Sequence, residues 1–164
     1  MAQNLNQEAK SPIAVSKRLP EFDLLNIFLG RWYLDGYLGI NSSAGIGKHV
    51  LGEDSFEWAP DKQSLQFSWS RTTDEETRNE VGLITYDLVG KNLVTHTRNQ
   101  GGTEKTYRTL MSGRTLTLRG DSERALINVS IDEHMTINWE QRTDSRKWVP
   151  LCELRGSKNK QIFS

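Results

Sequence analysis

Turn signals recur at short, regular intervals through most of this chain, and they constrain its fold more than any other feature. From Arg31 onward, clusters of Gly, Pro, Asn, Asp, Ser or Thr follow one another about every 8–12 residues. These residue types tolerate left-handed dihedrals or hydrogen-bond their own backbone. The clusters divide the region into about ten short segments. The spacing predicts an all-β fold, and the lack of helical periodicity after residue 30 excludes a parallel α/β fold.

Several of the segments alternate between apolar and polar residues, which assigns their faces. Each of the following groups is predicted to share one face: Leu65, Phe67, Trp69 and Arg71; Ala125, Ile127, Val129 and Ile131; Met135, Ile137, Trp139 and Gln141. Two segments stay open: either Leu93, Thr95 and Thr97 or Val94, His96 and Arg98 point inward, and either Tyr107, Thr109 and Met111 or Thr106, Arg108 and Leu110. Alternation of this kind is typical of a closed antiparallel barrel, which leaves no exposed strand edges.

The stretch from Pro20 to Trp32 has a different pattern. Phe22, Leu25 and Phe28 recur at helical spacing, and Gly30 ends the run. We therefore expect a short N-terminal helix that covers one end of the barrel. The predicted organisation is a polar arm at 1–19, disordered or acting as a lid, a single barrel domain at 20–158 and a tail at 159–164.

Composition narrows the classes of partner. The chain has 164 residues with 21 basic and 21 acidic side chains, which argues against nucleic acid or an anionic membrane surface as the main partner. No apolar run is long enough for membrane insertion. One cysteine and a polar N-terminus without a signal-peptide core favour a cytoplasmic location. Homodimer formation is left open.

Several short motifs carry a family resemblance. They are Leu25 with Phe28-Leu29-Gly30-Arg31-Trp32, Tyr86-Asp87, Gly102 with Tyr107, and Trp139-Glu140 followed by Trp148-Val149-Pro150 and Arg155. The Gly-x-Trp after a short helix resembles the calycin superfamily of lipocalins and fatty-acid-binding proteins. The order of motifs is similar to the lipocalin-like family of domain of unknown function 1579. The resemblance implies a barrel with an interior ligand and a cation–π contact between Arg155 and Trp32.

Motifs for other chemistry are incomplete. The run Gly45-Ile46-Gly47-Lys48 lacks the first glycine and the final hydroxyl residue of a phosphate-binding loop. His49, His96 and His134 are far apart in sequence, so we expect no metal and no cofactor. Cys152 alternates with apolar neighbours and is expected to be a core thiol rather than a nucleophile.

The barrel interior is therefore the expected site. A cavity with aromatic walls and a few polar groups is the usual form of a small-molecule site. The ligand-binding candidates are Trp69, Arg71, Tyr107, Trp139, Gln141, Phe67 and Met135. An inward Arg beside Tyr or His would suit a carboxylate, enolate or carbonyl group on an otherwise hydrophobic ligand. The alternative is a cofactor-independent cyclase or isomerase that positions its substrate and transfers protons, with His96, Tyr86 and Glu140 as catalytic candidates. An interior filled by side chains would exclude both functions.

Overall fold

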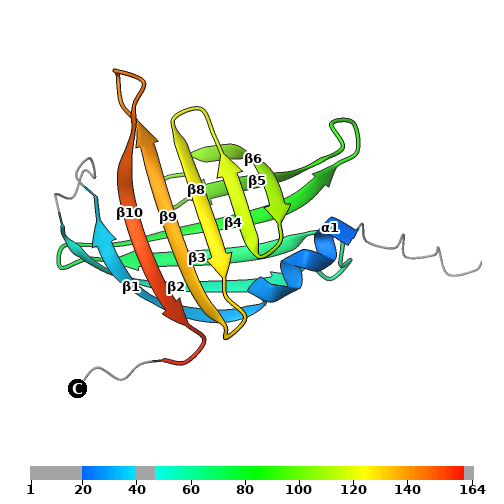
Figure 1. Cartoon of the computed structure of the whole chain (residues 1–164), viewed down its shortest axis with the longest axis horizontal. Helices are drawn as coiled ribbons and strands as arrows, with labels where there is room; N and C mark the ends of the chain where they lie inside the picture. The colour runs from blue at the N-terminus through cyan, green and yellow to red at the C-terminus, as the bar shows by residue number, and fades with distance from the viewer. Residues whose placement is uncertain (1–19, 40–46, 161–164) are drawn as a thin grey trace, which may run out of the picture.

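The computed structural model describes residues 20–39 and 47–160, so the predicted arm at 1–19 and part of the tail lie outside the described residues. Its ten strands form one closed barrel in which each strand pairs antiparallel with its neighbours in sequence and β1 also pairs with β10 (Figure 1). The strands are β1 (Gly30–Leu38), β2 (His49–Trp58), β3 (Leu65–Thr72), β4 (Thr77–Asp87), β5 (Asn92–Asn99), β6 (Glu104–Ser112), β7 (Thr115–Arg119), β8 (Glu123–Val129), β9 (His134–Arg142) and β10 (Trp148–Ser157). The predicted all-β barrel of about ten strands is confirmed.

The segment before β1 is helical in two short pieces. An α-helix of four residues, α1 (Pro20–Asp23), runs directly into a 3₁₀-helix, η1 (Leu24–Phe28). Phe22, Leu25 and Phe28 are buried in the barrel core, and the ring of Phe28 lies 5.7 Å from that of Phe56 on β2. Gly30 follows with a φ of +112°, a conformation that favours glycine. Figure 1 shows the two pieces at one end of the barrel.

The register decides which face of each strand points inward. Leu93, Thr95 and Thr97 of β5 are buried, as are Tyr107, Thr109 and Met111 of β6. In both strands, the first of the two faces considered in the sequence analysis therefore points inward. The hydroxyls of Thr95 and Thr109 lie 2.6 Å apart and satisfy each other inside the core.

Two details of the sequence interpretation are wrong. The side chain of Arg155 is exposed, and this residue pairs with Asp35 in the register of β1 and β10, so Arg155 lies on the outer face. Trp32 is fully buried on the inner face, so the expected contact between the two does not form. The amine that sits over the Trp32 ring belongs to Lys158, 5.1 Å from the ring centroid. Ile131 is 88% exposed because β8 ends at Val129, which places Ile131 in the turn before β9.

The junction between the first and last strands depends on glycine. A Cβ atom at Gly36 would lie 1.7 Å from the carbonyl oxygen of Glu153, and one at Gly156 would lie 1.8 Å from that of Tyr33. Any side chain at either position would force β1 and β10 apart. These two glycines therefore allow the barrel to close.

Candidate functional site

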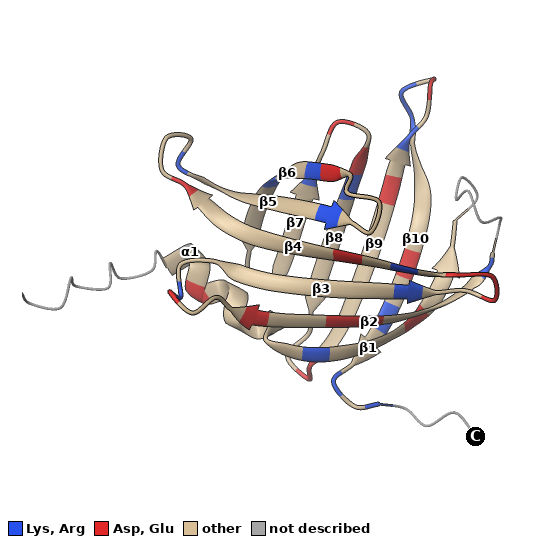
Figure 2. Cartoon of the chain, turned by 180° about the vertical axis from the view of Figure 1, so that it is seen from behind, with Lys and Arg blue, Asp and Glu red and all other residues tan. Residues whose placement is uncertain are grey.

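A cavity of about 450 Å³ opens at the end of the barrel away from α1. Its walls come from the end of β1, the start of β2, the β3–β4 and β5–β6 turns and the adjoining parts of β6, β8, β9 and β10. Figure 2 shows charged segments of β3 and β4 at this end. The lining includes Leu38, Val50, Trp69, Arg71, Glu76, Arg78, Glu80, Lys105, Tyr107, Glu123, Trp139 and Cys152. The other end of the interior is filled by the apolar core around Trp32.

A buried ion pair forms one wall. Arg71 on β3 donates to both carboxylate oxygens of Asp54 on β2, with Nη2 at 3.2 Å from Oδ2. The exposed fraction of the side chain is 13% for Arg71 and 4% for Asp54. Burial raises the pKa of Asp54, and the Arg71 guanidinium offsets part of that rise. The guanidinium also lies 4.7 Å from the Trp69 ring, so Arg71 is held on two sides.

A second polar group joins β6 to β8 beyond the end of β7, along one wall of the cavity. Lys105 Nζ donates to both carboxylate oxygens of Glu123 at 3.0 and 3.2 Å, and the Tyr107 hydroxyl donates to Oε2 at 3.0 Å. Burial and the nearby Glu123 charge raise the pKa of Tyr107, which keeps this hydroxyl protonated as a donor. The Tyr107 ring meets the Trp139 ring edge-on, with centroids 5.6 Å apart.

Glu80 on β4 differs from the other carboxylates of the lining. It pairs in register with Trp69 and with Asn99, which places it between the two polar groups. Within residues 20–39 and 47–160, no cation lies within ion-pair distance of its carboxylate. Burial raises the pKa of Glu80, while Thr97, Lys105 and Arg71 partly counter the rise and Glu123 adds to it.

Cys152 faces the cavity from β10, so it is a half-buried wall residue rather than a closed core thiol. A register shift between Pro150 and Cys152 brings it opposite Trp139. Burial raises the pKa of its thiol to about 11, which keeps it protonated and unreactive near neutral pH.

The structure brings together four of the seven predicted ligand-binding residues. Trp69, Arg71, Tyr107 and Trp139 all line the cavity. Phe67 packs against Phe56 with ring centroids 5.7 Å apart. Met135 is fully buried in the core and Gln141 pairs in register with Glu123, and neither lines the cavity.

The three predicted catalytic residues lie in three different places. Tyr86 packs against Phe22 near α1, with ring centroids 6.3 Å apart. Glu140 is half-buried on β9 and pairs with Arg124 at 3.0 Å, next to Arg124's contact with Trp148. His96 is exposed on β5 and hydrogen-bonds the Thr106 hydroxyl at 3.2 Å. None of the three lines the cavity, so they do not form one catalytic group with it.

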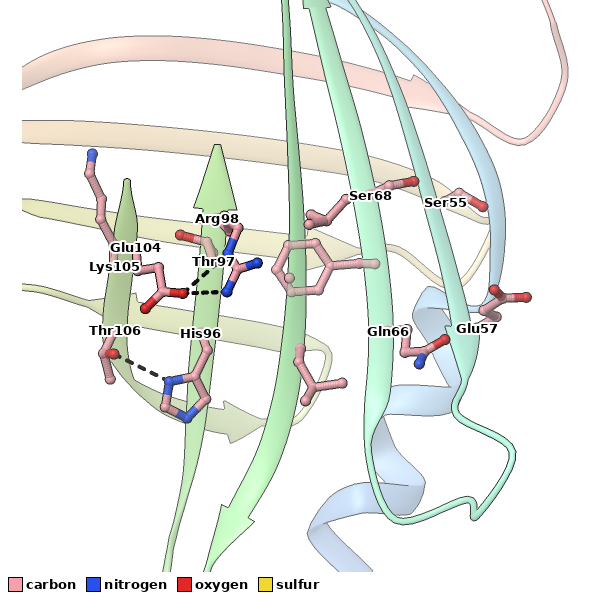
Figure 3. A pocket seen from close by; sticks show the side chains of 14 residues that line it. Ser55, Glu57, Gln66, Ser68, His96, Thr97, Arg98, Glu104, Lys105 and Thr106 are labelled. Carbon is pink, nitrogen blue, oxygen red and sulfur yellow. Dashed lines mark hydrogen bonds and ion pairs between the residues drawn. The ribbon is translucent and has the colours of Figure 1, made fainter. Parts of the chain in front are cut away.

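His96 instead lies in a groove of about 640 Å³ on the outer face of β2 to β6. Figure 3 shows its labelled side chains, among them Ser55, Gln66 and Ser68, and the ion pair between Arg98 and Glu104, 2.5 Å long. The groove is an open sheet face lined mainly by polar side chains that already bond to one another or face solvent. The cavity in the barrel mouth, whose walls include three aromatic side chains, is the better candidate for holding a small molecule.

Six charged residues of the site were not predicted: Asp54, Glu76, Arg78, Glu80, Lys105 and Glu123. Alternation contained a signal for three of them. Asp54 is two residues from Phe56, Glu80 is four from Ile84, and Lys105 is two from Tyr107, each on the inner face. A search for charged residues in phase with the apolar face would have found them.

Replacing Glu80 with Gln is expected to stabilise the protein at neutral pH. Because the folded-state pKa of Glu80 is raised, its contribution to stability is fully present below the ordinary Glu pKa and is lost as pH rises through the folded-state value. The variant should therefore have a higher free energy of unfolding than the wild type in urea at about pH 7, and the gain should vanish near pH 4. Glu57→Gln, at an exposed position, is the matched control. A Glu80→Gln protein less stable than the wild type at neutral pH would contradict this assignment.

Among residues 20–39 and 47–160, no group of His, Cys, Asp or Glu is arranged to hold a metal ion. The same residues contain no helix long and apolar enough to cross a membrane.

Comparison with known proteins finds distant structural likenesses and no matching family. No protein-family model matches the chain, so membership of the family of domain of unknown function 1579 is not shown, and no curated protein matches it. Among solved structures, the S-type phycobiliprotein lyase CPES from Guillardia theta is 11% identical, with a TM-score of 0.48 over 85% of this chain and 93% of that one. The zebrafish ileal bile acid-binding protein complexed with cholic acid is 13% identical, with a TM-score of 0.43 over 80% and 98%. This chain is a closed, ten-stranded antiparallel barrel with a cavity at one end.

Proposed function

We propose that this protein binds an amphipathic small molecule in the cavity at the open end of its barrel. The observation that carries the proposal is the combination of a 450 Å³ cavity with walls from Trp69, Tyr107 and Trp139 and a few fixed polar groups. Aromatic walls hold an apolar body by burying its surface, and fixed polar groups orient it. The buried ion pair and the Tyr107–Glu123 hydrogen bond pre-organise the walls, so binding requires little ordering of side chains.

Filling the cavity is expected to weaken ligand binding strongly. Cys152→Phe places a large ring in the space that the ligand would occupy, and affinity for the neutral fluorescent dye N-phenyl-1-naphthylamine should fall by about tenfold or more. Dye fluorescence during titration measures the affinity.

Two variants control for other effects. Cys152→Ser tests loss of the thiol without filling the space, and Leu126→Phe adds a ring on the outer face, where Leu126 is 48% exposed. Both should bind the dye like the wild type. Equal binding by Cys152→Phe and the wild type would place the ligand elsewhere and contradict the proposal.

One observation favours a second candidate function, proton transfer on a bound hydrophobic molecule. Glu80 is a cavity carboxyl whose pKa is raised by burial, which suits a general acid or base. The test is hydrogen–deuterium exchange at the acidic carbon of a hydrophobic ketone such as 2-tetralone, followed by NMR. Acceleration that Glu80→Gln removes would support cofactor-independent isomerase chemistry, and exchange at the buffer rate would exclude it.

A further inference from the structure

We propose that the ligand carries a cationic amine, which pairs with Glu80, rather than a carboxylate bound by arginine. This inference rests on the proposed function and names the chemical class of the ligand's polar group.

Every cation among the described residues that line the cavity already has an ion-pair partner. Arg71 is committed to Asp54 through two hydrogen bonds, Arg78 lies 2.7 Å from Glu76, and Lys105 is held by Glu123. An anionic headgroup that displaced Asp54 from Arg71 or Glu123 from Lys105 would leave a carboxylate unpaired in a partly buried place, which is costly. The Arg78–Glu76 pair lies at the solvent-exposed rim, where an added ion pair contributes little. Arg71 therefore lines the cavity, but Asp54 already neutralises its charge.

Glu80, in contrast to these paired cations, is a charged group without an ion-pair partner among the described residues. Its carboxylate lies between the two paired groups, and among the described residues it is the lining carboxylate without an ion-pair partner. Burial disfavours its charged form, as the raised pKa indicates, so an incoming cation would gain a charge-assisted hydrogen bond and relieve that cost. A ligand carboxylate at the same place would face both Glu80 and Glu123 and be repelled.

The neighbouring rings favour the same ligand class. Trp69 is the cross-strand neighbour of Glu80, and Trp139 and Tyr107 complete the aromatic walls. The faces of aromatic rings carry negative potential and attract cations. Arg71 already uses this attraction at Trp69, at 4.7 Å. An amine with an apolar body would meet a carboxylate and aromatic faces in one cavity.

The test uses three ligands with similar tails and different headgroups: n-decylamine, n-decanol and n-decanoate. Each is titrated against the wild-type protein, Glu80→Gln and the exposed control Glu57→Gln by isothermal calorimetry at neutral pH. We expect decylamine to bind the wild type more tightly than decanoate by about tenfold or more, because a hydrogen bond between charged groups adds to tail burial. Glu80→Gln should remove most of this preference, and Glu57→Gln should keep it.

The outcomes separate the two proposals. Decanol binding without an advantage for decylamine, or a preference for decanoate, would overturn the cationic ligand while leaving the cavity function intact. A preference for decylamine that survives Glu80→Gln would overturn the role of Glu80. Failure of all three ligands to bind would overturn the proposed function and the further inference with it.

Discussion

Replacing Arg71 with Met is expected to destabilise the protein by about 3–5 kcal/mol, one of the two largest effects expected of a single substitution here. The substitution leaves Asp54, whose side chain is 4% exposed, as a buried charge without its partner. It also removes the cation from the Trp69 ring. Urea unfolding at neutral pH, monitored by circular dichroism, measures the loss.

A double variant that removes both Asp54 and Arg71 measures how much the ion pair itself contributes to stability, apart from the cost of leaving Asp54 unpaired. Asp54→Leu combined with Arg71→Met replaces both charges with apolar side chains, which often restores or exceeds wild-type stability. We therefore expect the double variant to be more stable than Arg71→Met alone. If Arg71→Met unfolds at the same urea concentration as the wild type, Asp54 does not depend on Arg71 as a buried ion-pair partner. That result would contradict the geometry of this wall.

Trp32→Ala is also expected to lower the free energy of unfolding by about 3–5 kcal/mol, the second large effect. Trp32 is fully buried at the filled end of the barrel, and its indole N–H donates to the Phe28 carbonyl oxygen at 2.7 Å. The substitution opens a cavity in the core and leaves that carbonyl unpaired, and both changes favour unfolding. Thermal and urea unfolding measure the change.

Trp148→Ala provides the matched control for loss of an indole. Trp148 lies on the outer face, where Arg124 covers its ring at 4.3 Å, and its removal should cost less than about 1 kcal/mol. Equal destabilisation by the two substitutions would contradict the assignment of Trp32 to the core and Trp148 to the surface.

The fold followed from periodicity because the strands are local and consecutive. Turn residues and alternation are short-range signals, and an up-and-down barrel pairs each strand with its neighbours in sequence. The inner faces of β3 and β9 could be assigned because large apolar residues recur with period two. In β5 and β6, both faces carry polar and apolar residues, so the sequence did not show which face points inward. Only the register of the two strands decided this.

Side-chain partners at the site could not be predicted because they depend on the register between paired strands, which alternation along one strand does not specify. Alternation gave Arg71 an inward face, but its partner Asp54 lies 17 residues away on β2. Without that pairing, Arg71 was interpreted as an anchor for an anionic group. The ion pair removes this role, and the cation over Trp32 likewise came from Lys158 rather than Arg155 because register puts Arg155 on the outer face.

The five tryptophans allow one direct measurement of where the ligand binds. Trp69 and Trp139 line the cavity, Trp32 is in the core, Trp58 donates to the Asn26 side chain near η1, and Trp148 is on the outer face. Each indole N–H gives one resonance in a ¹H–¹⁵N spectrum, and single Trp→Phe variants assign them. Titration with n-decanol should shift the Trp69 and Trp139 resonances and leave the other three in place. Shifts confined to Trp32, Trp58 or Trp148, or no shift at saturating ligand, would contradict binding in the barrel cavity.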